Sequence, residues 1–85
     1  MGKDSRRTVT WARPNKSAAY LKECRTARGL SLADAAEGIG CSVGTLRRYE
    51  HEGIHGGIGA LRVFAVCWYY GISADALCEL AKQPA

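Results

Sequence analysis

The stretch SLADAAEGIGCSVGTLRRYE, residues 31–50, contains two helix-start signals eleven residues apart. Ser31 and Ser42 each precede a short helix-forming segment, and a serine at an N-cap accepts a hydrogen bond from a free backbone N–H. Inside a helix the same residue type is neutral or unfavourable. Residues 38–41 lie between the two segments, and we expect them to be too few and too rich in glycine to be helical. The stretch therefore predicts two short helices joined by a tight turn.

The second of these helices is predicted to have one buried face and one exposed face. Leu46 and Tyr49 are three residues apart, so they lie on the same side of the helix and face the core. The opposite side carries one aliphatic residue, one glycine and two arginines, which are Val43, Gly44, Arg47 and Arg48. A helix that is apolar on one side and cationic on the other meets the physical requirement for lying in the major groove of DNA.

An ordered series of positions resembles the Cro/cI-like phage-repressor helix-turn-helix domains, and the similarity runs from about Tyr20 to Leu77, roughly two thirds of the chain. The series comprises Arg25, Gly29-Leu30-Ser31, Ala36, Ile39-Gly40, Ser42, Thr45-Leu46 and Arg48-Tyr49-Glu50. The resemblance implies an all-α, five-helix, lambda-repressor-like domain over residues 17–85. It also implies a sequence-specific transcriptional regulator that binds double-stranded DNA, either a phage or prophage repressor or a Cro-like protein.

The resemblance places the base contacts on the outer face of helix 43–50. Arg47 and Arg48 each match the donor geometry of guanine O6 and N7, and Val43 offers a methyl contact to thymine. Gly44 supplies no side chain for readout, but it permits a close approach of the helix to the groove. The phosphate contacts are expected from the starts of the two helices, where free N–H groups and the helix dipole favour an anion. Those residues are Leu32, Ser42 and Thr45.

Residues 1–16 are predicted to form a basic, mostly disordered arm. They hold five basic residues against one acidic residue, whereas the rest of the chain has as many acidic as basic residues. The net charge of +4 therefore lies entirely in this segment, which favours a polyanion as partner. We expect Arg6, Arg7 and Arg13 to contact phosphates or enter a groove, although a solvated tail without function has the same composition. Trp11 either packs back onto the domain or stacks on DNA.

A first helix is predicted from a cap at Asn15 or Ser17 to about residue 28. Gly29 ends it, since glycine is common just after the last helical residue. In the resembling family, an arginine at the position of Arg25 pairs with a glutamate at the position of Glu50, which ties this helix to the end of the recognition helix. The alternative is that Arg25 and Glu50 are unrelated surface charges.

The C-terminal half is predicted to contain a glycine-rich loop, 51–59, and two helices, 58–70 and 73–82. The first of these helices carries two apolar stripes. We expect the stripe of Ala60, Val63, Phe64, Cys67 and Tyr70 to be core, and the stripe of Leu61, Ala65 and Trp68 to lie beside it. One apolar stripe is enough for a small core, so the additional apolar residues favour a homodimer interface at Leu61, Trp68 and Cys78. A buried position in the core explains Trp68 about as well.

Length and composition favour one small domain that is not an enzyme. The chain has 85 residues, and its longest apolar run, residues 63–70, is far shorter than the ~20 residues that span a membrane. No signal peptide is visible, so we expect a cytoplasmic location in a bacterium or an infected host cell. The four cysteines, at positions 24, 41, 67 and 78, match no zinc spacing and read as reduced thiols.

No pattern for catalysis or for ligand binding is recognisable. His51 and His55 have the spacing of a metal pair, but the glycines around them argue against the helix that such a pair needs. The glycines at 56–59 lack the Lys-Ser/Thr of a phosphate loop. We therefore expect no metal, no cofactor and no small-molecule ligand. A second hypothesis is that the chain is an antitoxin or a protein-interaction adaptor, which uses the apolar face of the last two helices.

Overall fold

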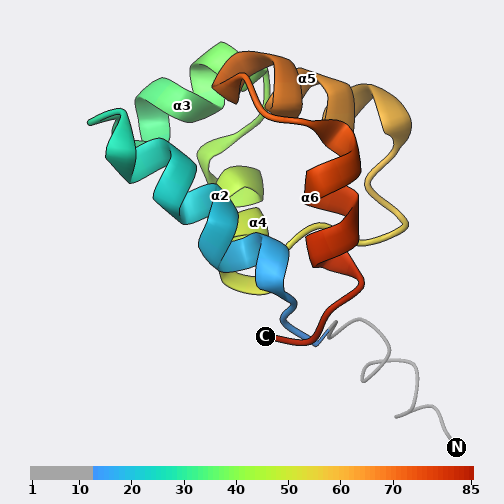
Figure 1. Ribbon diagram of the computed structural model, residues 1–85. Coiled ribbons are helices and arrows are strands. Elements are labelled where there is room, and N and C mark those ends of the chain that lie inside the picture. The colour runs from blue at the N-terminus through green and yellow to red at the C-terminus, as the bar shows by residue number, and fades with distance from the viewer. Residues whose placement is uncertain (1–12) are drawn as a thin grey trace, which may run out of the picture.

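The computed structural model describes residues 13–85, and five helices make up most of this part of the chain (Figure 1). They are α2 (Lys16–Ala27), α3 (Leu32–Ile39), α4 (Val43–Glu52), α5 (Ala60–Tyr70) and α6 (Ala74–Ala81). Among the described residues, the sole β-type pairing is an isolated bridge between Asn15 and Pro84. The prediction of an all-α domain of five helices is confirmed.

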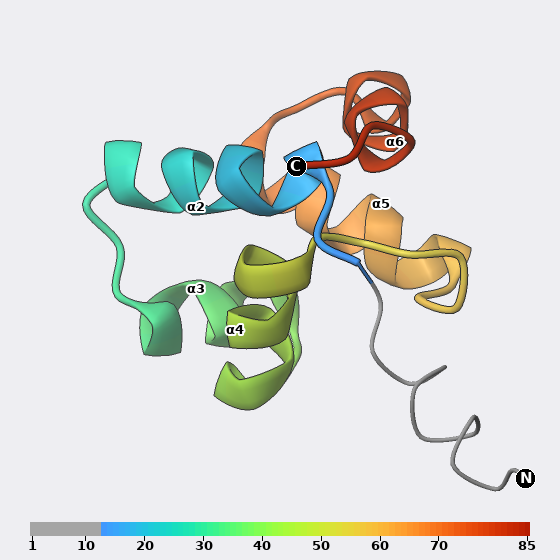
Figure 2. The ribbon, with the colours of Figure 1, turned by 90° about the horizontal axis from the view of Figure 1, so that it is seen from below.

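The helices enclose one core. α2 contacts α4 and α6, α3 contacts α4 and α5, and α5 contacts α6. Figure 2 shows α3 and α4 together on one side of α2, with both helices beginning on the side of the domain that faces away from α6. The two ends of the described chain also meet, because the N–H of Ala85 donates to the carbonyl of Pro14 and the N–H of Lys16 donates to the carbonyl of Gln83. Fully or almost fully buried side chains from all five helices fill the centre: Leu21, Ala35, Ala36, Leu46, Val66, Tyr70 and Leu77.

Three serine caps start helices where the sequence predicts them. The hydroxyl oxygens of Ser31, Ser42 and Ser73 accept hydrogen bonds from backbone N–H groups three residues further on, at 3.0, 3.0 and 3.2 Å. α2 is capped by Asn15, whose Oδ1 accepts from the N–H of Ser17 at 2.9 Å. Residues 15 and 16, expected at the end of the arm, therefore form the cap and the first position of α2.

The expectation of a non-helical turn over residues 38–41 is wrong in its first half. Gly38 and Ile39 belong to α3, and Gly40 ends that helix in the left-handed region at φ +92°. Position 38 needs glycine because the ring of Tyr69 from α5 packs directly on the backbone there and leaves no room for a side chain. A Cβ at Gly38 would lie only 2.2 Å from a carbon of that ring. The glycine thus serves a helix contact rather than a turn.

The predicted inward face of α5 is also partly wrong. Val66, Cys67 and Tyr70 are buried, whereas Ala60 is exposed and Phe64 is 60% exposed. The two stripes are adjacent, because successive residues of an α-helix are about 100° apart around its axis. Because almost every residue of α5 is apolar, the spacing alone does not fix which side faces inward. Contacts with α3 and α6 decide it.

Candidate nucleic-acid interface

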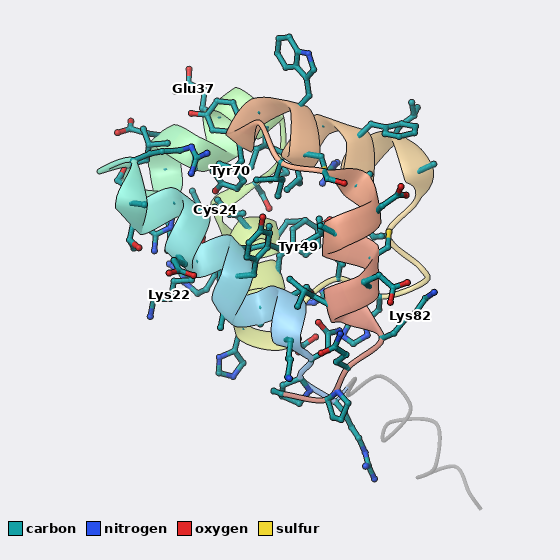
Figure 3. All side chains as sticks on the ribbon, in the orientation of Figure 1. Lys22, Cys24, Glu37, Tyr49, Tyr70 and Lys82 are labelled. Atoms are coloured by element: carbon teal, nitrogen blue, oxygen red, sulfur yellow. The ribbon has the colours of Figure 1, made fainter. Side chains whose placement is uncertain are left out.

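α4 lies with one side in the core and the other side open to solvent. Leu46 is fully buried and Tyr49 packs against the core from a half-buried position. Figure 3 shows Tyr49 and Tyr70 directed into the space between the helices, while Lys22 and Lys82 lie at the periphery. Arg47 and Arg48 are exposed, so the domain's own helices leave both guanidinium groups accessible.

The outer face of α4 combines the two arginines with a flat start. Val43 is half-buried and packs at the edge of the core, so only part of its side chain is open to a partner. Gly44 is exposed, and a Cβ there would meet nothing closer than the Ser42 hydroxyl oxygen at 4.0 Å. The exposed side of the first turn of α4 therefore lacks a long side chain, and the nearest ones, Arg47 and Arg48, come from the next turn.

An ion pair holds the second half of α4 from behind. Arg25 Nε lies 2.7 Å from Glu50 Oε2, and Arg25 Nη2 donates to Glu50 Oε1 at 3.0 Å. The third guanidinium nitrogen, Nη1, donates to the carbonyl oxygen of Leu30 at 2.8 Å. The two side chains are only 13% and 6% exposed. The hydrogen bonds that Arg25 donates to Glu50 raise the pKa of Arg25 above its ordinary value. The pair therefore fixes α4 against α2.

A second polar cluster holds the end of α4. Gly53 ends the helix at φ +94°, a conformation that favours glycine, and a Cβ there would lie 2.1 Å from Asn15 Oδ1. The N–H of Asn15 donates to the carbonyl of Glu52 and its Nδ2 donates to the carbonyl of Ile54, both at 3.0 Å. The Ser17 hydroxyl oxygen accepts from the N–H of Ile54 at 2.9 Å. Sequence reasoning missed this cluster, although the glycine at 53 signalled the end of a helix.

The starts of α3 and α4 carry free backbone N–H groups beside small polar side chains. Leu32 is the first residue of α3, and its cap Ser31 is exposed. The Ser42 hydroxyl donates to Thr45 Oγ1 at 2.9 Å, which leaves the Thr45 O–H group available as a donor. Both helix starts therefore offer donors to an anion, as expected from the helix dipole.

Arg62 is a cationic residue beside α4 that sequence reasoning did not single out. It comes from the first turn of α5, and its Nη1 donates to the Tyr49 hydroxyl oxygen at 3.5 Å. A hollow of about 450 Å³ separates it from Arg48. Arg48 is 71% exposed, with Glu52 at 3.9 Å, so this ion pair is loose and weak. The prediction for α5 used only the spacing of its apolar residues, so it gave no role to the single arginine in that helix.

The residues expected at a dimer interface fall on two separate surfaces. Leu61 and Trp68 are 85% and 87% exposed, and they share one face of α5 with Phe64. Cys78 is exposed on α6, where it lines a different hollow together with Val63 and Ala81. Trp68 is thus not a core residue, and Cys78 lies beside another part of α5, near Val63.

Arg13 is the one expected arm contact that lies within the described residues, and it is exposed. Arg6, Arg7 and Trp11 lie outside them. His51 is on α4 and His55 is in the following loop, and no group of metal-binding side chains occurs in residues 13–85. Within the same residues all four cysteines are free thiols, and burial raises the pKa of Cys24, Cys41 and Cys67.

No single helix in the described part of the chain has the length and apolar composition to cross a membrane. α5 and α6 pass that test only when they are taken together, and the pair is bent by 117°.

Residues 18–80 match the family model of the helix-turn-helix domain. The chain belongs to this helix-turn-helix family. The match runs from α2 into α6 and includes the α3–turn–α4 unit on which the resemblance was based. Membership suggests a DNA-binding regulator, in a family that is typically not enzymatic. No curated protein matches the sequence.

Proposed function

We propose that this helix-turn-helix domain is a sequence-specific transcriptional regulator of the phage- or prophage-repressor or Cro-like type, with α4 as its recognition helix. One observation carries the proposal. α4 is fixed from behind by Leu46, by the Arg25–Glu50 pair and by the cluster at Gly53, while Arg47 and Arg48 project outward. A recognition helix needs this combination, because base readout depends on side chains held in a fixed register.

Arg47 and Arg48 are the residues proposed to read bases. Each exposed guanidinium presents parallel donors that match guanine O6 and N7, and each good pair discriminates by about 1–3 kcal/mol. Val43 contributes an apolar contact to a thymine methyl group from its half-buried position. Gly44 lets the backbone of the first turn come close to the floor or wall of the groove.

Phosphate contacts are proposed from two groups of donors. The N–H groups near Leu32 and Ser42 lie at the starts of α3 and α4. The hydroxyl of Thr45 and the guanidinium of Arg62 line one hollow beside Arg48, where Arg62 extends the cationic surface beyond α4. The arm, through Arg6, Arg7 and Arg13, adds contacts that depend on charge rather than on sequence.

A homodimer is the proposed assembly. The exposed apolar face of α5 is self-complementary in chemistry, and two-fold pairing is the commonest way to cover such a face. Leu61 and Trp68 would lie in the interface, whereas Cys78 belongs to another surface. Two recognition helices would then address half-sites about 34 Å apart on one face of the duplex.

The test is a duplex titration at two salt concentrations with single-arginine variants. The site is first selected from a randomised pool. We expect the affinity to fall steeply with salt, and Arg47→Ala or Arg48→Ala to cost about 1–3 kcal/mol for the selected site and much less for random duplex. Lys22→Ala on α2 removes one exposed positive charge from another helix and is the matched control. If all three variants bind equally, α4 is not the reading helix.

The exposed face of α5 also supports a second candidate, an antitoxin or adaptor that binds a protein with this surface. Under that function, binding to the partner is lost on Trp68→Ala and is insensitive to Arg47→Ala. Either function is expected to operate in the cytoplasm, where the DNA of a bacterium or an infecting phage is found.

A further inference from the structure

A second apolar hollow lies on the side of the domain where residues 53–59, α5 and α6 meet. It encloses about 400 Å³ and exposes much more apolar than polar surface. Its lining comes from the loop, from the first turns of α5 and from the last turn of α6: Ile54, His55, Ile58, Ala60, Val63, Cys78, Ala81 and Lys82. The outer face of α5, with Leu61 and Trp68, is not part of it.

This hollow is continuous with the point where the N-terminal segment enters the domain. A smaller hollow of about 340 Å³ is lined by Arg13, Pro14 and Pro84, and it shares His55, Ala81 and Lys82 with the apolar one. Arg13, the first described residue, therefore lies beside the mouth of the apolar hollow.

We propose that Trp11 packs into this hollow and fixes the path of the basic segment that precedes it. Trp11 is two residues before Arg13, and two extended residues span about 7 Å. Pro14 favours an extended backbone at Arg13, which lets the short tether approach its full length. No other residue in positions 1–12 combines aromatic bulk with so short a tether.

The chemistry of the hollow suits an indole. A tryptophan carries about 150–250 Å² of largely apolar surface, and a hollow near the lower end of the ~300–1,000 Å³ range of small-molecule sites holds one such group. Lys82 also lines the hollow, and the methylene stem of a lysine adds apolar surface in such a place. The docking is intramolecular and does not depend on the proposed DNA-binding function.

Tryptophan fluorescence of the full chain tests the proposal. The sequence has two tryptophans, so Trp68→Phe leaves Trp11 as the sole reporter, and Trp68 is too exposed to affect folding. Acrylamide, a neutral quencher, is applied to this protein and to a synthetic peptide of residues 1–12. Ala60→Glu and Cys78→Glu each place a carboxylate in the hollow from an exposed position, and Ala76→Glu places one on α6 outside it.

We expect Trp11 in the full chain to emit at shorter wavelength than the peptide and to be quenched several-fold less efficiently. Both carboxylate variants in the hollow should restore the quenching seen for the peptide, while Ala76→Glu should not, and circular dichroism should show all three folded. The proposal is overturned if Trp11 is quenched as in the peptide, or if the two variants leave its protection unchanged. Protection that appears only with duplex DNA, or only at high protein concentration, overturns it too.

Discussion

α4 and α5 each bury one face in the same core, but their outer faces have opposite chemistry. The outer face of α4 presents Gly44, Arg47 and Arg48, and the outer face of α5 presents Leu61, Phe64 and Trp68. Packing limits which residues can occupy the inner faces, so their composition reflects the fold. It does not limit the outer faces, so their composition indicates what kind of partner could bind there. The comparison is the basis for proposing a polyanion as the partner of α4 and a protein surface as the partner of α5.

The inner faces differ as well. α4 is held by polar groups that satisfy one another, namely the Arg25–Glu50 pair and the cluster around Gly53. α5 is held mainly by apolar packing, with polar contacts near its two ends, where Arg62 donates to the Tyr49 hydroxyl oxygen and Arg28 donates to the carbonyl oxygen of Tyr70. Its one buried hydroxyl, that of Tyr70, has no hydrogen-bond partner in the described residues. Within residues 13–85, α4 is thus anchored by a buried ion pair and α5 is not, as expected if α4 is the helix that reads sequence.

The largest effect is expected from Arg25→Ala. The change leaves the carboxylate of Glu50 buried without its cation, and breaking a buried pair in this way costs about 3–5 kcal/mol. That is a large part of the stability of a domain of this size. Urea denaturation followed by circular dichroism measures it, with Lys82→Ala as a control that breaks only the exposed pair with Glu79. Equal, small effects of the two variants would mean that α4 needs no polar anchor.

A smaller effect is expected from Trp68→Ala on self-association. A large aromatic residue at the centre of an interface contributes about 2 kcal/mol or more, which is roughly a 30-fold weaker dimer. Because Trp68 is 87% exposed in the single chain, urea denaturation of the monomer should change by no more than about 0.5 kcal/mol. Sedimentation equilibrium gives the dissociation constant, and Glu23→Ala on α2 is the control. A wild-type chain that is monomeric at all concentrations would refute the dimer.

The same comparison explains how far the sequence predicts the fold. In α4 the polar and apolar residues alternate clearly, so Leu46, Tyr49 and the two arginines were all placed on their correct sides. In α5 nearly every residue is apolar, so the predicted core stripe was correct at Cys67 and Tyr70 but wrong at Ala60 and Phe64. The buried Val66 was not in it. The spacing of apolar residues along a helix shows which face is buried only where polar residues occupy the opposite face.

The site was predicted unevenly for a related reason. Arg25 and Glu50 lie far apart in sequence, and only the resemblance to a family brought them together. Asn15 and Gly53 are brought together by the packing of α2 against α4, which no local pattern reveals. Arg62 was overlooked because its neighbours are apolar. The sequence predicted the helices themselves, but it did not predict most of the contacts between them.

Tyr70→Phe is expected to stabilise the domain by about 1 kcal/mol, because it removes a buried hydroxyl without a partner. Burial, followed by the charge of Glu50, raises the pKa of Tyr70 to about 12. The unfolded chain releases this proton near pH 10, so ionisation favours unfolding as pH rises from 10 to 12. The contribution of Tyr70 is thus complete below pH 10 and lost through that window.

Thermal unfolding of wild type and Tyr70→Phe at a series of pH values measures this effect. The variant should lose less stability between pH 10 and 12, although not all of the loss disappears, since burial also raises the pKa of Tyr20, Cys24 and Cys67. Identical pH profiles for the two proteins would show that the Tyr70 hydroxyl is hydrated in solution.

The smallest change in stability, and the one that separates the two helices most finely, is expected from Gly44→Ala. The added methyl group meets open space, and alanine is the better helix former, so the domain should gain about 0.5 kcal/mol. If the first turn of α4 presses against DNA, the same methyl group weakens specific binding by a few-fold while the fold becomes more stable. Duplex titration and urea denaturation of the one variant give both values. A variant that is more stable and binds equally well would place the groove further along α4, at Arg47 and Arg48 alone.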